Sequence, residues 1–209
     1  KSKEDAVIPD HFKDVDNNWY GFSALPMIIM YNTELVGEDE VPKSWDDITD
    51  EKWKGQISFA DPAKSGSSYT TLVTMKTAYE DDGDEGWNFI KKFIENLDGK
   101  LAAGSGNVYK GVADGEYAIG LTLEEAAMRY VNAGADVGVV YPKEGTSAVP
   151  DGIAIIKGAK NLENAKLFLD FTLGKTVQEM VVNDFSRRSV RTDASNPEGL
   201  GPIDLIKLV

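Results

Sequence analysis

Short apolar segments alternate with longer amphipathic segments along the 209 residues, and this alternation restricts the fold more than any other feature. The apolar segments, such as 25–31 and 116–122, have the length and composition of buried strands. The amphipathic segments repeat apolar residues at intervals of three and four, which predicts helices. Strands that alternate with helices of this length predict an α/β domain, with helices flanking a mixed, mainly parallel sheet.

The helical pattern predicts both boundaries and inward faces. We expect helices over 124–132, 162–173 and 176–183, and strands over 136–141 and 152–157. In the helix over 162–173, the residues expected to point inward are Ala165, Phe168, Leu169 and Leu173.

Composition excludes several functions. The formal charge is −13, and the Lys and Arg residues form no cluster of the kind that binds a nucleic-acid backbone. The acidic runs at 37–40 and 80–82 are interpreted as solvated loops. With no cysteine and one histidine, His11, the sequence offers no thiolate chemistry and little basis for a metal site, so no cofactor is expected.

The first candidate site is the loop Ser65-Gly66-Ser67-Ser68, between a predicted strand and a predicted helix. Hydroxyls and unpaired backbone N–H groups at the positive end of a helix can hold an anion, and Gly66 permits close approach. The alternative is that Ser65 only caps the helix.

The second candidate is the glycine-rich loop that contains Ser105 and Asn107. Its glycine spacing matches neither of the common nucleotide-binding fingerprints. An ordinary glycine-rich turn explains the loop equally well.

The third candidate combines Thr122 and Glu124, at the end of an apolar strand, with Glu144 in a later turn. Carboxylates in such positions can accept hydrogen bonds from hydroxyl or ammonium groups. Glu124 and Glu125 could instead only favour the start of a helix. Glu124 and Glu144 could in principle act as acid and base, but no nucleophile and base are paired in the sequence, and we assign no catalytic residue.

A series of short motifs follows one order along nearly the whole chain: Trp19-Tyr20-Gly21, Tyr31-Asn32, 41–48, Trp53-Lys54-Gly55, Asp61-Pro62 with Ser65-Gly66-Ser67, 112–116, 141–146, 151–159 and 165–171. This order resembles the periplasmic (type 2) solute-binding proteins of ABC importers, in the group that takes up ferric iron, phosphonates and sugar phosphates.

The resemblance implies two α/β lobes joined by crossover strands, with ligand bound between them. It implies that most of the first lobe is absent from this chain. Residues 1–30 would be the end of that lobe with a crossover strand, 31–150 the second lobe, and 151–209 a return crossover strand with C-terminal helices. Since Lys1 comes first and no signal peptide precedes it, we expect that the natural N-terminus has been removed.

By resemblance, the phosphate contact of the family falls on Ser65, Gly66 and Ser67, and a further contact falls near Ser105 and Asn107. Iron binders of the group use adjacent tyrosines just after the strand that ends here at Thr122, whereas this chain has Leu123-Glu124-Glu125. The expected ligand is therefore a small anionic solute, an organic phosphate or phosphonate, that Thr122, Glu124 and Glu144 help to orient.

The expected partner is a membrane permease of an ABC importer. The expected location is the periplasm or the extracellular face, where the full-length protein could carry a lipid anchor. Two alternatives stay open at this stage: an Fe(III)-binding protein of an iron importer, and a hydrolase that acts on phosphate esters through Glu124 and Glu144.

Overall fold

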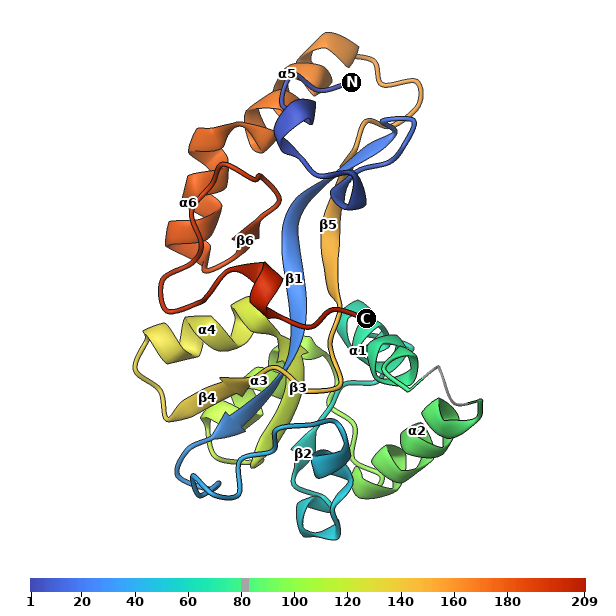
Figure 1. Cartoon of the computed structure of the whole chain (residues 1–209), viewed down its shortest axis with the longest axis vertical. Coiled ribbons are helices and arrows are strands. Elements are labelled where there is room, and N and C mark those ends of the chain that lie inside the picture. The colour runs from blue at the N-terminus through green and yellow to red at the C-terminus, as the bar shows by residue number, and fades with distance from the viewer. Residues whose placement is uncertain (80–82) are drawn as a thin grey trace. The chain divides into compact units, whose positions relative to one another are not determined.

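The computed structural model describes residues 1–79 and 83–209, so the acidic run at 80–82 lies outside the described residues. The chain forms two compact units (Figure 1). Unit 1 comprises Lys1–Leu25 and Val149–Leu205, and unit 2 comprises Pro26–Ala148 and Ile206–Val209. The backbone therefore passes between the units at 25–26, 148–149 and 205–206.

Unit 2 is built on a mixed sheet with the strand order β2-β3-β1-β4. Its strands are β1 (Trp19–Asn32, which begins in unit 1), β2 (Ile57–Ser58), β3 (Ile119–Leu123) and β4 (Val137–Val140). β1 runs antiparallel to β3 and to β4, whereas β2 runs parallel to β3. The expected mixed α/β sheet is confirmed, but the expectation that it is mainly parallel is wrong, because the central strand β1 pairs antiparallel with both β3 and β4.

The central strand β1 is apolar on both faces because each face supports a separate core. Successive side chains of a strand point to opposite sides of the sheet. Ile29 packs in one core with Trp45, and Ile28 and Met30 pack in the other with Val112. Burial on both faces explains why this strand reads as one continuous apolar run.

In the described part of unit 2 the sheet is covered by the helices α1 (Gly66–Thr77), α2 (Glu85–Asn96), α3 (Ser105–Ala113) and α4 (Glu124–Asn132). α4 begins and ends where the sequence predicts. After α2 the backbone reaches positive φ at Asp98 and Gly99, which stops the helix. Two short 3₁₀ helices, Asp46–Thr49 and Glu51–Trp53, precede β2.

Unit 1 contains the first part of β1, β5 (Ala148–Ala154, which begins in unit 2), α5 (Leu162–Leu173), α6 (Lys175–Phe185) and β6 (Arg188–Ser189). Short 3₁₀ helices lie at Asp5–Val7, Asp10–Phe12 and Ile203–Leu205. β5 and β6 both pair with β1. The core of unit 1 joins these parts through Ile8, Phe12, Tyr20, Ala24, Leu169, Leu173 and Val190.

The inward face predicted for α5 is partly wrong. Leu169 and Leu173 are buried, but Phe168 is 61% exposed. Neighbouring residues of a helix lie about 100° apart around its axis, so Phe168 and Leu169 do not share a face. Phe168 is exposed, as are Leu167 and Phe171 of the same helix.

The strand expected over 152–157 starts and ends earlier, at Ala148–Ala154. No helix in the described part of the chain combines the length and the apolar character that a bilayer-spanning segment needs.

Candidate functional site

Three helices of unit 2 begin at the same edge of the sheet. β2 and β3 are parallel, and Ala60, just beyond β2, forms a parallel bridge with Ala102. These three segments therefore end at one edge, the carboxyl edge, and each is followed by a helix: α1, α3 or α4. Ligands of α/β sheets collect at such edges, where loops lead into helix N-termini.

Ser65 is the N-cap of α1. Its backbone is extended, and its Oγ accepts a hydrogen bond from the backbone N–H of Ser68 at 3.3 Å. The hydroxyls of Ser65 and Ser67 lie 3.1 Å apart. The cap interpretation of Ser65 is therefore confirmed, and the cap draws the two hydroxyls together at the helix start.

The first two amides of α1 remain open. Within the described residues, the N–H groups of Gly66 and Ser67 have no hydrogen-bond acceptor, as expected for the first turn of a helix. A Cβ added at Gly66 would meet no atom within 4 Å. Gly66 is exposed and Ser67 is half-buried, so two donors without protein acceptors lie at the positive end of a helix, an arrangement suited to an anion.

Ser105 and Asn107 both lie in the first turn of α3. Gly104, in an extended conformation, is the N-cap, and Ser105 is the first helical residue. The side chain of Asn107 is exposed and lines a hollow along α3 with Ser58, a residue that the sequence did not single out.

The start of α4 holds a buried carboxylate. Glu124, the first residue of α4, is only 1% exposed, and the hydroxyl of Tyr141 donates a hydrogen bond to its Oε2. Thr122, at the end of β3, is also buried and lies opposite Ile28 of β1. Tyr141 was not predicted as a site residue, because its contact with Glu124 depends on how β4 and α4 meet in space.

The structure places Glu144 elsewhere. Its Oε2 accepts a hydrogen bond from the backbone N–H of Trp45 at 2.9 Å, and the Trp45 indole donates to the carbonyl of Gly145. Burial, with the nearby Glu144 carboxylate, raises the pKa of Tyr79. Glu144 therefore anchors a turn to the fully buried Trp45 rather than joining the helix starts.

The carboxyl edge thus brings together six of the predicted residues, and the other two, Asn107 and Glu144, have different surroundings. The six are Ser65, Gly66, Ser67, Ser105, Thr122 and Glu124.

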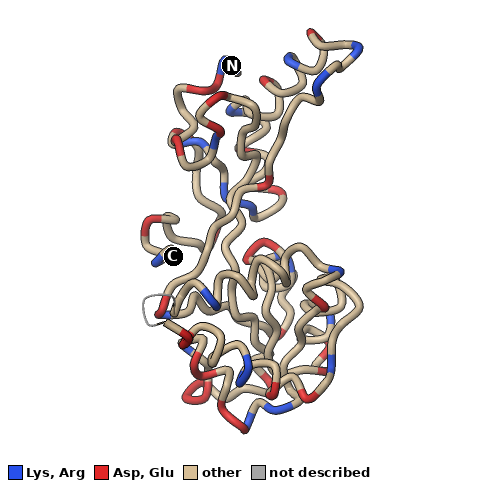
Figure 2. Tube along the Cα trace, turned by 90° about the vertical axis from the view of Figure 1, so that its right-hand side faces the viewer, with Lys and Arg blue, Asp and Glu red and all other residues tan. Residues whose placement is uncertain are grey.

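Neither the distribution of charged residues (Figure 2) nor the grouping of metal-ligating side chains marks a further site among the described residues. Basic and acidic residues are interspersed along both units (Figure 2). Within residues 1–79 and 83–209, no three His, Asp or Glu side chains are grouped in a way that could hold a metal ion.

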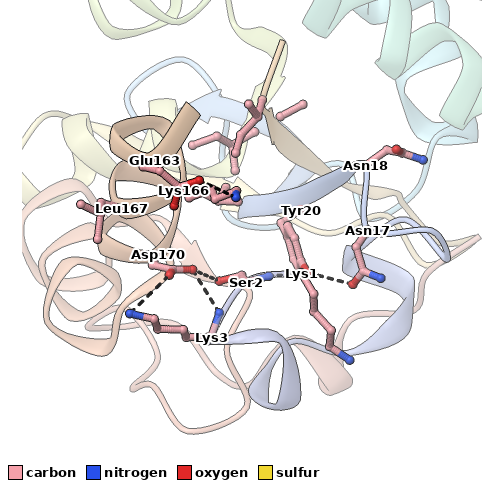
Figure 3. A pocket seen from close by; sticks show the side chains of 14 residues that line it. Lys1, Ser2, Lys3, Asn17, Asn18, Tyr20, Glu163, Lys166, Leu167 and Asp170 are labelled. Atoms are coloured by element: carbon pink, nitrogen blue, oxygen red, sulfur yellow. Dashed lines mark hydrogen bonds and ion pairs between the residues drawn. The ribbon is translucent and has the colours of Figure 1, made fainter. Parts of the chain in front are cut away.

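A cavity of about 410 Å³ in unit 1 is lined by apolar residues and by polar groups that hydrogen-bond to one another (Figure 3). Asp170 of α5 accepts hydrogen bonds from the Ser2 hydroxyl at 2.6 Å and from the Lys3 N–H at 3.0 Å. The Ser2 hydrogen bond holds the pKa of Asp170 below its usual range. The Tyr20 hydroxyl accepts from the Ser2 N–H and lies 2.8 Å from Oδ1 of Asn17. This network ties the N-terminal segment to α5.

Comparisons with known proteins agree on one family. The family described as bacterial extracellular solute-binding protein matches residues 1–199. A protein of Haemophilus influenzae is 34% identical over 181 residues, which are 85% of this chain and 51% of that protein. Iron uptake protein A1 of Synechocystis is 26% identical over 189 residues, again 85% of this chain and 51% of the relative.

A solved structure gives the same result. The periplasmic binding protein AfuA of Actinobacillus pleuropneumoniae, with fructose-6-phosphate bound, has a TM-score of 0.87 and 28% identity, covering 100% of this chain and 67% of AfuA. The chain spans about half the length of the curated relatives it matches. It belongs to the family of bacterial extracellular solute-binding proteins.

Proposed function

We propose that the chain is part of the extracytoplasmic solute-binding component of an ABC importer, and that it binds a small organic phosphate or phosphonate for delivery to a membrane permease. The observation that carries the proposal is the pair of open amides at Gly66 and Ser67. They meet a phosphate at the positive end of α1, and the Ser65 and Ser67 hydroxyls lie beside them.

The contacts at α1 are strong enough to matter but not to act alone. A hydrogen bond to a charged group contributes about 1.5–3 kcal/mol, and a helix N-terminus adds about 0.3–1 kcal/mol. Millimolar affinity already requires about 4 kcal/mol. The α1 contacts therefore supply an anion subsite, and high affinity needs further contacts to the rest of the solute.

Glu124 and Thr122 are the proposed partners for the uncharged part of the solute. Thr122 lies near the end of β3 and Glu124 is the first residue of α4, along the same sheet edge as Gly66. A carboxylate accepts hydrogen bonds from hydroxyl or ammonium groups, which a sugar phosphate or an aminophosphonate would supply. Since Glu124 and Glu144 have different partners, we propose binding without turnover.

The solved relative supports this solute class, because the protein AfuA is described with fructose-6-phosphate bound. Ferric iron is a second candidate, which the likeness to iron uptake protein A1 favours. The hydrogen-bonded Tyr141 and Glu124 would supply two oxygen ligands for iron.

Calorimetry on the natural full-length protein tests the proposal, with fructose 6-phosphate, inorganic phosphate and ferric citrate as probes. In Gly66→Leu the new side chain enters the open space at α1, so we expect fructose 6-phosphate to bind at least about tenfold more weakly. Gly152→Leu is the matched control, since a Cβ there also meets nothing within 4 Å.

Equal affinity in the Gly66→Leu and control proteins would overturn the anion subsite. Binding of ferric citrate that depends on Tyr141, without binding of fructose 6-phosphate, would establish the iron alternative instead.

A further inference from the structure

A hollow of about 340 Å³ lies along the flank of α3 in unit 2. α3 runs away from the carboxyl edge, so Lys110 and Asp114 lie progressively farther from the open amides of α1. The polar residues of the lining are Ser58, Asn107, Lys110, Asp114 and Glu116, and the aromatic one is Tyr117. Most of this hollow is therefore separate from the proposed anion subsite.

Ser58 gives the hollow an unpaired polar group. The residue is 2% exposed, and its buried Oγ has no hydrogen-bond partner among the described residues. Leaving a buried hydroxyl unpaired destabilises a folded protein, and such groups are rare in native structures. An alanine would fill the same place in β2 without this cost, so the hydroxyl needs another explanation.

Two further polar side chains of the lining are also unpaired. Within the part of the chain that the structure describes, neither the Asn107 amide nor the Glu116 carboxylate forms a hydrogen bond through its side chain. Lys110, by contrast, is ion-paired with Asp114. The hollow is therefore bordered by a buried hydroxyl without a protein partner and by an exposed amide and an exposed carboxylate, and the carboxylate acts electrostatically on Lys110.

The charged and polar side chains that line the hollow determine which class of ligand it can bind. Lys110 opposes a simple cation, and Asp114 with Glu116 opposes a simple anion. A hydroxyl group both donates and accepts, so it can satisfy the serine, the amide and the carboxylate in turn. Tyr117, packed over Gly111, adds an apolar surface.

We propose that this hollow binds a small neutral polyhydroxyl compound, such as a monosaccharide, at a second site on unit 2. Ser58, Asn107 and Glu116 make the hydrogen bonds, and Tyr117 contacts the carbon side of the ring. The site would let the protein carry a neutral sugar independently of the anionic solute at α1.

An NMR titration of the 209-residue chain with D-glucose tests the proposal. We expect saturable shifts of the backbone amides of Asn107, Lys110, Gly111 and Glu116. In Ser58→Ala and in Asn107→Ala the affinity should fall by about fivefold, the effect of one hydrogen bond. Ser58→Ala should also raise the Tm of the unliganded chain, because it removes an unpaired buried hydroxyl.

Absence of shifts up to saturating glucose, shifts that persist unchanged in both variants, or a lower Tm in Ser58→Ala would each overturn the proposal. Glucose carries no phosphate, so its result is independent of the response of Gly66 and Ser67 to fructose 6-phosphate. The two sites can therefore fail separately.

Discussion

The cavity of unit 1 and the carboxyl edge of unit 2 are both polar, but their hydrogen bonds differ. In unit 1, Ser2 donates hydrogen bonds to Asp170 and to Tyr20, so these polar groups of the cavity wall already have protein partners. At the edge of unit 2, the amides of Gly66 and Ser67 have no acceptor among the described residues. Donors that already have acceptors gain little from a ligand, whereas open donors gain a full charged hydrogen bond.

The two regions differ in how far their polar groups are already paired. The cavity of unit 1, about 410 Å³, contains hydrogen bonds that tie the N-terminal segment to α5. The predicted anion subsite is identified by unsatisfied backbone groups, not by depth.

The largest effect is expected in unit 1. Asp170→Ala removes the acceptor of two hydrogen bonds and leaves the Ser2 hydroxyl unpaired, so unfolding free energy should fall by about 2–3 kcal/mol. Urea denaturation measures the change. The shifts that fructose 6-phosphate causes at Gly66 should stay the same, and their loss would mean that the two regions are not independent.

The next effect separates the cap of α1 from the anion subsite. Ser65→Ala removes the cap and should destabilise the chain by about 1 kcal/mol, whereas Ser65→Asp retains a cap. The aspartate would repel a phosphate, so the affinity of Ser65→Asp for fructose 6-phosphate should fall at least about tenfold. Stable protein with unchanged affinity in Ser65→Asp would leave Ser65 as a cap only. Thermal denaturation and NMR titration supply the two readouts.

A smaller effect follows from the lowered pKa of Asp170. In the unfolded chain the pKa of this carboxyl is about 4, and in the folded chain its pKa is lower. Its contribution to stability is therefore present above about pH 4 and is lost as the pH falls through the folded pKa. In Asp170→Asn the acid decline of stability should be shallower than in the parent chain. Denaturation curves between neutral and acidic pH measure the difference, and identical declines would show that the Ser2 hydrogen bond does not favour the charged carboxylate.

The smallest effect is expected at the rim of the unit 1 cavity. Glu163 and Lys166 form an ion pair of 2.8 Å, but their side chains are 81% and 52% exposed. Exposed pairs contribute about 0–1 kcal/mol, so Glu163→Ala should change the unfolding free energy by less than about 0.5 kcal/mol. A loss of unfolding free energy as large as that in Asp170→Ala would show that the Glu163–Lys166 pair belongs to the stabilising network of Ser2 and Asp170.

Local sequence signals predicted much of the fold. The bounds of α4 follow from the apolar run before it and the glycine after it, and the start of α1 follows from the cap residue Ser65. Such signals depend on residues within one or two turns of each other. The same locality explains why the Ser65-Gly66-Ser67 loop could be selected as a candidate anion site.

Contacts between distant residues could not be predicted. Glu144 and Trp45 are 99 positions apart, and no local pattern shows that the carboxylate binds the tryptophan N–H. The hydrogen bond from Tyr141 to Glu124 also depends on tertiary packing that brings two separate elements together. Phe168 was expected inward because it is apolar, but the inner face of α5 is already occupied by Leu169 and Leu173.

The most direct test of the account is the response of two amides. The NMR spectrum of the 209-residue chain should be recorded while fructose 6-phosphate is added to millimolar concentration. We expect the Gly66 and Ser67 N–H signals to shift farthest, in the direction that hydrogen bonding to phosphate produces, and the signals of Asp170 and its neighbours not to respond. Shifts centred on the unit 1 cavity, or no shift at Gly66 and Ser67, would contradict this expectation.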